Sequence, residues 1–301
     1  MLDISHASSD ADLELLISVR RRVDPDVHPQ LANLRHFLAT TPTGTYLLAR
    51  LDGDAAGCGF VGGAPGAERL PAAEASFEVV PELRRRGVGT ALMRAASTHA
   101  GRHGHRGLRL EAKEDDGDSI AFLERRGYRE VGRERAVALD LAQVDEQGIV
   151  PPDGVEIVTR AGRPGLERGM YEVALDAVPD IPGEEEFAPT FEEWLDFENR
   201  PSRPPELVFV AVAGDEVVGY AALDVFGPRA FNGLTAVRRA WRRRGVATAL
   251  KRSQIAAAKR RGFARLETES EERNVPMRTL NERLGYVPVP GTIVFEGPLL
   301  E

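Results

Sequence analysis

Apolar and polar residues alternate along this chain in two successive series of short segments, and the second series has the same order as the first. Each half opens with a short apolar stretch that predicts a strand, at residues 2–4 and 155–158. Apolar residues at helical spacing follow, over residues 13–19 and 166–177. Turn residues then separate runs typical of antiparallel strands, so we expect a hairpin in each half.

The pattern after each hairpin predicts a strand, a glycine turn, an apolar helix, a fifth strand, a second helix and a closing strand. Helices and strands in this order, with antiparallel hairpins, indicate an α/β fold. The later strands are expected at 75–80, 108–112 and 130–141 in the first half, and at 233–237, 264–268 and 288–295 in the second.

The two halves are copies of one unit. The segment Val79 to Tyr128 recurs 158 residues later as Val237 to Tyr286 without a gap, and RRRGVGTAL in the first copy becomes RRRGVATAL in the second. Repeats of this length are domains, because each can bury its own core. We therefore expect one domain at 1–146, a linker at 147–154 and a second domain at 155–301.

Composition narrows the class of protein. The net charge of −8 divides evenly, with 19 basic and 23 acidic residues in 1–150 and 20 and 24 in 151–301. An acidic surface repels phosphate backbones, so no nucleic-acid partner is expected. The single cysteine, Cys58, is typical of a reducing compartment. No apolar run reaches the roughly 20 residues of a membrane span and no signal-peptide pattern is present, so we expect a cytoplasmic protein without a membrane partner.

Each copy has a strand that leads into R-x-x-G-x-G/A and then into a helix. Such a turn presents unpaired backbone N–H groups at a helix start, where the helix dipole also favours negative charge. Gly87 and Gly245 let a phosphate approach the backbone closely, and the hydroxyls of Thr90 and Thr248 can add ligands. The spacing matches neither the dinucleotide motif nor the ATP-binding loop, so the turn indicates another phosphate-bearing ligand.

These residues, with the downstream FLERRGY and NERLGY, resemble the GNAT N-acetyltransferase superfamily, whose tandem members include mycothiol synthase-like acyltransferases. The resemblance implies two tandem GNAT-like acyl-CoA N-acyltransferase domains, each an α/β (α+β) domain built on a mixed sheet. In each, the fourth and fifth strands would part around the pantetheine arm of acetyl-CoA, or of another short acyl-CoA. The acetyl group would pass directly to the primary amine of a small molecule, with backbone N–H groups near Val80 and Arg238 polarising the thioester carbonyl. The implied coenzyme-binding residues are Val79, Val80, Arg84, Arg85, Arg86, Gly87, Val88, Gly89 and Thr90 in the first copy, and Val237, Arg238, Arg242, Arg243, Arg244, Gly245, Val246, Ala247, Thr248, Asn274 and Asn281 in the second.

Three carboxylates are candidates for the base that removes the amine's proton. Glu111 and Glu269 occupy matching positions on the fifth strands, and Glu78 lies on the fourth strand of the first copy. The tyrosine with which the family protonates the leaving thiolate would fall at Leu123 and Asn281, so neither copy has it. Because the second half keeps the family's Asn274 where the first has Asp116, we expect the second half to be the better preserved catalytic site, with the first as its competitor.

Other interpretations remain open at the level of sequence. Loss of both tyrosines also fits a degenerate acyl-CoA-binding sensor or scaffold, and the duplication fits an interaction module. The chain could be a monomer or a homodimer. His99, His103 and His105 lack a further ligand at useful spacing, so no metal is expected. The Pro- and Glu-rich stretch 178–203 is either a solvated connection or a loop over the substrate. Only Lys113, Lys251 and Lys259 are lysines among the 39 basic residues, so arginine clusters carry little weight.

Overall fold

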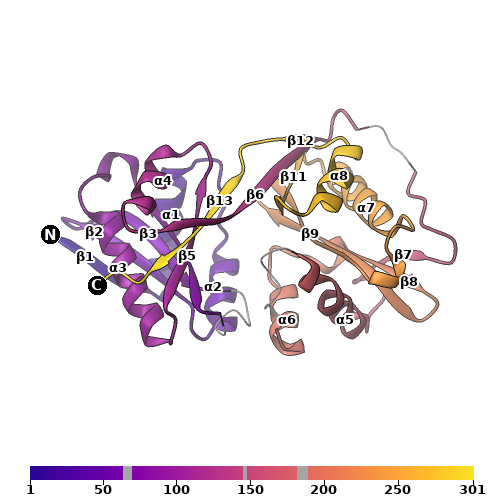
Figure 1. Cartoon of the computed structure of the whole chain (residues 1–301), viewed down its shortest axis with the longest axis horizontal. Helices are drawn as coiled ribbons and strands as arrows, with labels where there is room; N and C mark the ends of the chain where they lie inside the picture. Colours follow the sequence, from indigo (N-terminus) through magenta and orange to yellow (C-terminus); the bar gives the residue numbers. More distant parts are fainter. Residues whose placement is uncertain (64–69, 145–147, 182–188) are drawn as a thin grey trace. The chain divides into compact units, whose positions relative to one another are not determined.

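The computed structural model describes residues 1–63, 70–144, 148–181 and 189–301, and it divides the chain into two compact units (Figure 1). Residue 147 of the expected linker and residues 182–188 of the Pro- and Glu-rich stretch lie outside the described residues. Each unit is described by itself. In both, helices cover the two faces of a mixed sheet, as the sequence pattern predicts.

The sheet of the first unit has the strand order β1-β2-β3-β4-β5-β13, in which only β4 and β5 run parallel. Consecutive residues of β2 and β3 are buried, and since neighbouring side chains of a strand point to opposite faces, both faces of the sheet are covered. The strands are β1 (Leu2–Ala7), β2 (Thr45–Leu51), β3 (Asp54–Gly62), β4 (Ala72–Val79), β5 (Gly107–Lys113) and β13 (Thr292–Pro298).

Two pairs of helices bury the faces of this sheet. On one face lie α1 (Asp10–Val23) and α2 (Leu31–Thr40), and on the other α3 (Val88–Arg102) and α4 (Gly117–Glu124). Ser9 begins α1 with a capping box, since its hydroxyl accepts from Asp12 N at 3.2 Å while Asp12 bonds back to Ser9. The short helix η2 (Pro81–Leu83) joins β4 to the glycine turn.

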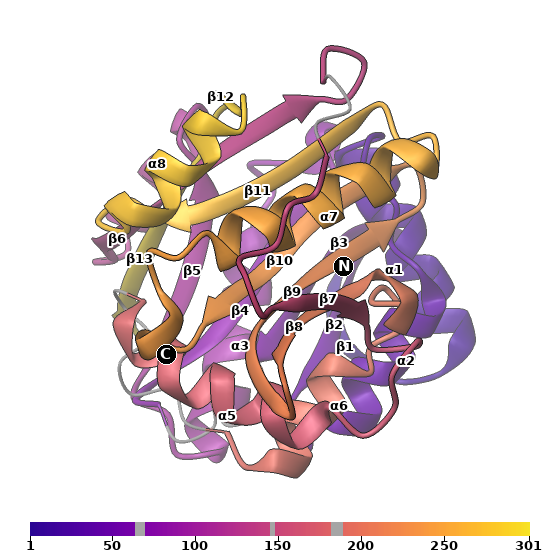
Figure 2. The same cartoon turned by 90° about the vertical axis from the view of Figure 1, so that its right-hand side faces the viewer.

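The second unit repeats this architecture with the strand order β7-β8-β9-β10-β11-β6, and the short β12 pairs with β6. Figure 2 shows α7 lying across the sheet of this unit. On one face lie α7 (Val246–Arg260) and α8 (Val275–Arg283), and on the other α5 (Glu167–Ala177) and α6 (Phe191–Glu198). The strands are β6 (Arg129–Asp140), β7 (Glu156–Thr159), β8 (Val208–Ala213), β9 (Glu216–Phe226), β10 (Arg229–Val237), β11 (Arg265–Glu271) and β12 (Val287–Pro288), and the short helices are η3 (Val178–Asp180), η4 (Pro205–Leu207) and η5 (Arg239–Trp241).

The two closing strands are exchanged between the units, which corrects the expected domain limits 1–146 and 155–301. Residues 134–140 of β6 pair with β11 in the second unit, and β13 pairs with β5 in the first. The first unit is therefore Met1–Gly132 with Thr292–Glu301, and the second is Arg133–Gly291. Both strands were located correctly, but the two fifth strands they pair with are so alike that local pattern cannot assign the partners.

In both units the parallel strands part before they reach the glycine turn. The pairing of β4 with β5 ends at Ala75 and Leu110, although β4 continues to Val79. The pairing of β10 with β11 ends at Phe231, although β10 continues to Val237. This gap between the fourth and fifth strands is the splay that the sequence resemblance implies.

Candidate functional site

The turn after the fourth strand has the same backbone in both units. Gly87 and Gly245 adopt left-handed conformations, with φ of 87° and 91°, and no side chain caps the helix that follows either of them. Arg85 and Arg243 are also left-handed, with φ of 62° and 61°. This conformation is strained in a residue other than glycine. Because both units have it at the same place, the surrounding structure must hold the backbone of the turn in this shape.

The backbone N–H groups expected to polarise a carbonyl are misassigned by one residue. The N–H of Val80 donates to Ala56 O at 3.0 Å, and that of Arg238 donates to Val218 O at 2.9 Å. Neighbouring N–H groups of a strand point to opposite sides, so those of Val79 and Val237 are directed toward the gap. These two valines are therefore the better donors to a carbonyl bound there.

The arginine that begins each turn ties the end of the strand to the turn. Arg84 Nε donates to Val79 O at 3.2 Å, and Arg242 Nε donates to Val237 O at 3.1 Å. The same valine thus directs its N–H toward the gap while an arginine holds its carbonyl. Arg85 pairs with Asp118 at 2.7 Å, on an exposed surface.

Two polar residues assigned to coenzyme binding already make internal hydrogen bonds. The Asn274 side chain accepts from Met277 N at 3.3 Å and so caps α8, as Asp116 caps α4 in the first unit. The Thr90 hydroxyl accepts from Arg126 Nη2 at 2.7 Å. Asn274 is thus a helix cap, and Asp116 can replace it without loss of that role.

Glu78 lies on β4 beyond the last pair with β5, on the face covered by α1. Its carboxylate accepts from Arg20 Nε at 2.9 Å, and both side chains are partly buried. This ion pair occupies the Glu78 carboxylate, so a base role for Glu78 would require the contact with Arg20 to be displaced. Arg20 could not be identified from the sequence, because it belongs to an RRR run with the appearance of a solvated helix end.

Glu111 follows Leu110, the last residue of β5 that pairs with β4, and therefore stands at the mouth of the gap. Leu110 and Ala112 point into the α3 side, so Glu111 points to the opposite face, toward the side of α1 and α2. Its side chain is exposed to solvent, yet the protein that surrounds its base desolvates the carboxylate and raises the pKa of Glu111, against the opposing charge of Arg109. A raised pKa makes a carboxylate a better base.

Glu269 is exposed on β11, at the matching place of the second unit. Glu267, two residues earlier on the same face, is paired with Arg229 at 2.5 Å. Of the three carboxylates that the sequence singled out, Glu78 and Glu111 thus lie on the same face of the first unit. The third, Glu269, belongs to the second unit.

The position of the family's tyrosine is buried in both units. Leu123 and Asn281 are 4% and 1% exposed. Leucine offers no proton, and the Asn281 Oδ1 atom has no hydrogen-bond partner within the described residues.

The turn of the second unit carries contacts that the first lacks. Asp180 accepts from Arg239 Nε at 2.9 Å and from Arg242 Nη1 at 2.6 Å, and these two hydrogen bonds lower its pKa to about 2. A Cβ atom on Gly245 would lie 3.8 Å from Pro152, whereas one on Gly87 would meet nothing within 4 Å. The first turn is therefore the more open of the two.

A buried polar group in the second unit was missed at the level of sequence. Lys251 in α7 is 1% exposed and lies 5.5 Å from the ring centre of Tyr286. Tyr286 in turn binds Asn232 of β10, whose Nδ2 donates to the phenol oxygen at 2.6 Å. The repeat could have revealed that this lysine is buried, because Lys251 aligns with the apolar residue Met93 of the first copy.

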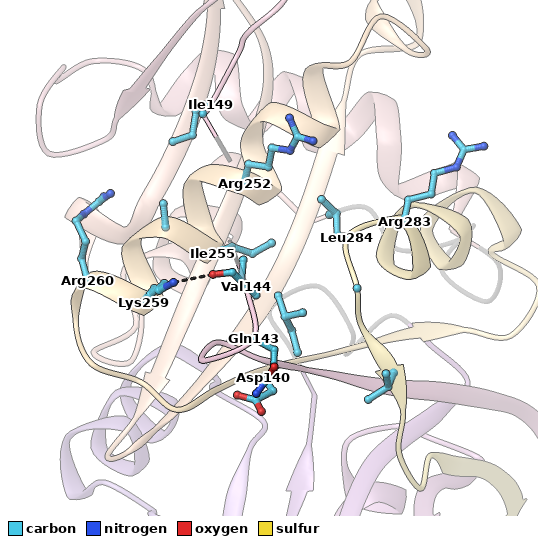
Figure 3. Close-up of a pocket in the computed structure, with 15 residues that line it drawn as sticks. Asp140, Gln143, Val144, Ile149, Arg252, Ile255, Lys259, Arg260, Arg283 and Leu284 are labelled. Carbon is cyan, nitrogen blue, oxygen red and sulfur yellow. Dashed lines mark hydrogen bonds between the residues drawn. The ribbon is translucent and has the colours of Figure 1, made fainter. Parts of the chain in front are cut away.

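A pocket of about 690 Å³ lies beside α7 and β6 in the second unit (Figure 3). Arg252, Ile255 and Lys259 of α7 line it together with Arg283 and Leu284 from the end of α8, and Lys259 Nζ donates to Val144 O at 2.6 Å. These residues belong to the later part of α7, so the pocket is separate from the glycine turn at the start of that helix.

Within the described ranges, no cluster of three or more His, Cys, Asp or Glu side chains could hold a metal ion. His99 and His105 instead bond to the carbonyls of Thr43 and Leu70, at 2.8 and 3.0 Å. Among the described helices, none combines the length and apolar character needed to cross a membrane.

Two segments of the chain, residues 13–128 and 169–286, match the family model described as Acetyltransferase (GNAT) family. Each match includes one glycine turn and one gap between the fourth and fifth strands. No curated protein matches the chain.

Solved structures share the fold over the whole chain. A tandem GNAT protein from the clavulanic acid biosynthesis pathway has a TM-score of 0.79 and 21% identity, covering 100% of this chain and 99% of that chain. A GCN5-related N-acetyltransferase from Sphaerobacter thermophilus has a TM-score of 0.74 and 21% identity, over 100% and 96% of the two chains. An acetyltransferase from Colwellia psychrerythraea gives a TM-score of 0.63 at 13% identity, over 98% and 99%. Identities this low bear on the fold alone.

Proposed function

Since the chain belongs to the GNAT acetyltransferase family, we propose that it is an acetyl-CoA-dependent N-acetyltransferase that transfers the acetyl group directly to the primary amine of a small molecule. The family makes it an acyltransferase with tandem domains. The proposal adds the acetyl donor, the amine acceptor and the residues that serve each.

The observation that supports the proposal best is the coincidence of two features in each unit. An uncapped helix begins at a left-handed glycine, and the preceding strand has separated from its parallel neighbour. A pyrophosphate fits the first feature, because helix N–H groups and the helix dipole favour anions. An extended arm fits the second, because the separated strands leave backbone groups unpaired.

Bound acetyl-CoA supplies an activated thioester, and the residues of the chain orient it. The N–H of Val79 is directed at the place where the thioester carbonyl would lie, and Arg84 fixes that residue through its carbonyl. Val237 and Arg242 form the matching pair in the second unit.

We assign acetyl transfer to the first unit, with Glu111 as the base. Its pKa is raised by desolvation, while Glu78 is paired with Arg20. Carboxylates on this face also attract a cationic amine. Glu269 is the corresponding candidate in the second unit. Since Leu123 cannot return a proton to the thiolate, solvent serves that step in the first unit.

Calorimetric titration of the whole chain with acetyl-CoA tests the coenzyme sites. Gly87→Asp and Gly245→Asp place a carboxylate against the pyrophosphate, and each should remove binding in its own unit. Gly87→Asn and Gly245→Asn are the matched controls, because Asn tolerates a left-handed backbone equally well without the charge. Absence of acetyl-CoA binding in the unaltered chain would exclude the proposal.

Transfer itself is tested by thiol release with a panel of aminosugars and polyamines. Glu111→Gln should lower kcat/KM about 100-fold or more, the range lost with a general base. Glu78→Gln should have a smaller effect. Coenzyme binding without thiol release for any amine would favour an acyl-CoA-binding sensor instead.

A further inference from the structure

The interior of the second unit contains polar side chains where a core is normally apolar. Lys251, Asn232 and Asn281 are each no more than 2% exposed. Lys251 faces the ring of Tyr286, and Asn232 bonds to the Tyr286 hydroxyl at 2.6 Å. Lys251, Asn232 and Tyr286 come from α7, β10 and the turn before β12, so three parts of the unit contribute to one polar cluster.

Asn232, within this cluster, has unmet hydrogen-bonding capacity. Within the described residues its Oδ1 is buried without a hydrogen-bond partner, as are Asn281 Oδ1 and Thr235 Oγ1 of the same unit. Each such atom costs free energy comparable to the desolvation of a polar group, about 1–3 kcal/mol, and few are retained in native cores. The unpartnered oxygen of Asn232, in a cluster that also holds the buried Lys251, indicates that something polar completes the cluster.

The first unit shows that the fold does not require these polar residues. In the repeat, Lys251 aligns with Met93, Asn281 with Leu123 and Thr235 with Phe77. Met93 and Leu123 belong to the apolar core of their unit. Tyr128, the counterpart of Tyr286, donates its hydroxyl to the backbone carbonyl of Pro298 at 2.9 Å. The polar cluster is thus specific to the second unit.

Lys251 has no carboxylate partner in the part of the chain that the structure describes. Desolvation by burial lowers its pKa to about 7. Glu267 and Glu269 of β11 point away, because Leu266 and Thr268 occupy the face toward α7. From the segment before β12 it meets the Tyr286 phenol, whose pKa is raised by burial, and the neutral Asn232 amide of β10 binds that phenol. A buried ammonium without a counter-ion is costly, so the site is suited to an anion.

The cluster lies at the inner end of the gap between β10 and β11. Asn232 comes directly after Phe231, the last residue of β10 paired with β11. An acyl-CoA arm that enters the gap at the glycine turn directs its acyl end, rather than its phosphates, toward this point, and an acyl chain longer than acetyl extends from the carbonyl at Val237 further along β10. We propose that the second unit prefers an acyl donor whose acyl group ends in a carboxylate, with Lys251 as the counter-charge that selects it. This inference rests on the proposed binding of acyl-CoA by the second unit.

The test compares succinyl-CoA with acetyl-CoA by calorimetry on the Gly87→Asp chain, in which the first site is disabled. Succinyl-CoA should bind about tenfold more tightly, a difference of about 1.4 kcal/mol. Lys251→Met introduces the residue that the first unit has at this position and should abolish the preference. Equal affinities for the two donors would overturn the inference, while acetyl-CoA binding by the unaltered chain would still support the proposed function.

Proton uptake gives a second measurement that needs no core substitution. An anion beside Lys251 raises its pKa, so near pH 8 succinyl-CoA should bind with uptake of a proton, approaching about one per site. Titration in buffers of different ionisation enthalpy measures this number. Acetyl-CoA should give no uptake at this site. The same uptake with free succinate alone would show that the carboxylate site does not belong to the acyl donor and would also overturn the inference.

Discussion

Arg84 holds Val79 in place by donating from its guanidinium to the carbonyl oxygen at 3.2 Å, and Arg242 repeats the contact with Val237 at 3.1 Å. Because the N–H of the same valine is directed toward the gap, the first arginine of each turn controls the donor indirectly. The same hydrogen bond therefore explains why both copies of the turn begin with an arginine.

Arg84→Gln should therefore weaken acetyl-CoA binding in the first unit about three- to tenfold, the effect of losing one partly solvated hydrogen bond to a charged group. Arg242→Gln should do the same in the second unit only. Calorimetric titration of the whole chain separates the two effects. Arg102→Gln, an exposed change at the far end of α3, serves as the control, and an equal loss in that variant would contradict the explanation.

Glu111→Gln should remove the acidic limb of the kcat/KM profile. Since desolvation raises the pKa of Glu111, that limb should lie above the ordinary range of a glutamate in the unaltered enzyme. Measurement of kcat/KM from about pH 4 to 8 checks this, with Glu14→Gln on the exposed side of α1 as the control. A limb that persists in Glu111→Gln would assign the base to another residue.

The same substitution should stabilise the protein at neutral pH. A raised folded-state pKa contributes stability below the unfolded pKa, and this contribution is lost as the pH rises through the folded pKa. The Gln side chain carries no charge, so Glu111→Gln should raise Tm at pH 7 and change it little at pH 4. A lower Tm at pH 7 would show that the carboxylate is stabilising.

Gly233→Ala should destabilise the second unit. A Cβ atom there would lie 2.4 Å from Arg203 Nη2 and 2.8 Å from Asp224 Oδ2, which bind each other at 2.9 Å. Arg203 is 2% exposed and also pairs with Glu198, so displacing it leaves buried charges uncompensated, at a cost of about 3–5 kcal/mol. Urea denaturation measures the loss. Gly132→Ala, where a Cβ meets nothing within 4 Å, should change stability by less than about 1 kcal/mol.

The exchanged strands predict a crossed pattern of local unfolding. Phe295 is 2% exposed in the core of the first unit, and Leu139 is 4% exposed in the core of the second. Phe295→Ala should cost about 3–5 kcal/mol and speed hydrogen exchange in residues 2–113, and Leu139→Ala should cost about 2–5 kcal/mol and act on residues 208–271. Effects confined to each residue's own half of the sequence would contradict the exchange.

Sequence alone located most elements of this fold. The repeat of fifty residues gave both copies of the turn, and the left-handed Gly87 and Gly245 are where their spacing placed them. The local sequence pattern did not predict which strand each closing strand pairs with, because the edges of β5 and β11 are nearly equivalent. That choice is decided by tertiary packing, such as Phe295 in the first core.

The candidate site was only partly accessible to sequence. The turn residues follow from backbone chemistry, which a motif encodes directly. Pairing of Glu78 with Arg20, and the direction of the Val79 N–H, depend on contacts between residues far apart in the chain. Burial of Lys251 could have been suspected from its alignment with Met93, although the alignment does not reveal that a carboxylate is missing beside it.

The exchange of closing strands also sets an order for folding during synthesis. When residues 1–132 leave the ribosome, the outer edge of β5 has no strand to pair with, because residues 292–298 are made only after all of 133–291. An open edge of this kind attracts other strands, including those of neighbouring nascent chains. The second unit can close its sheet first, since β6 precedes β11 in the chain. Although it is translated first, the amino-terminal unit is thus the last to be completed, and its exposed edge is a natural substrate for chaperones.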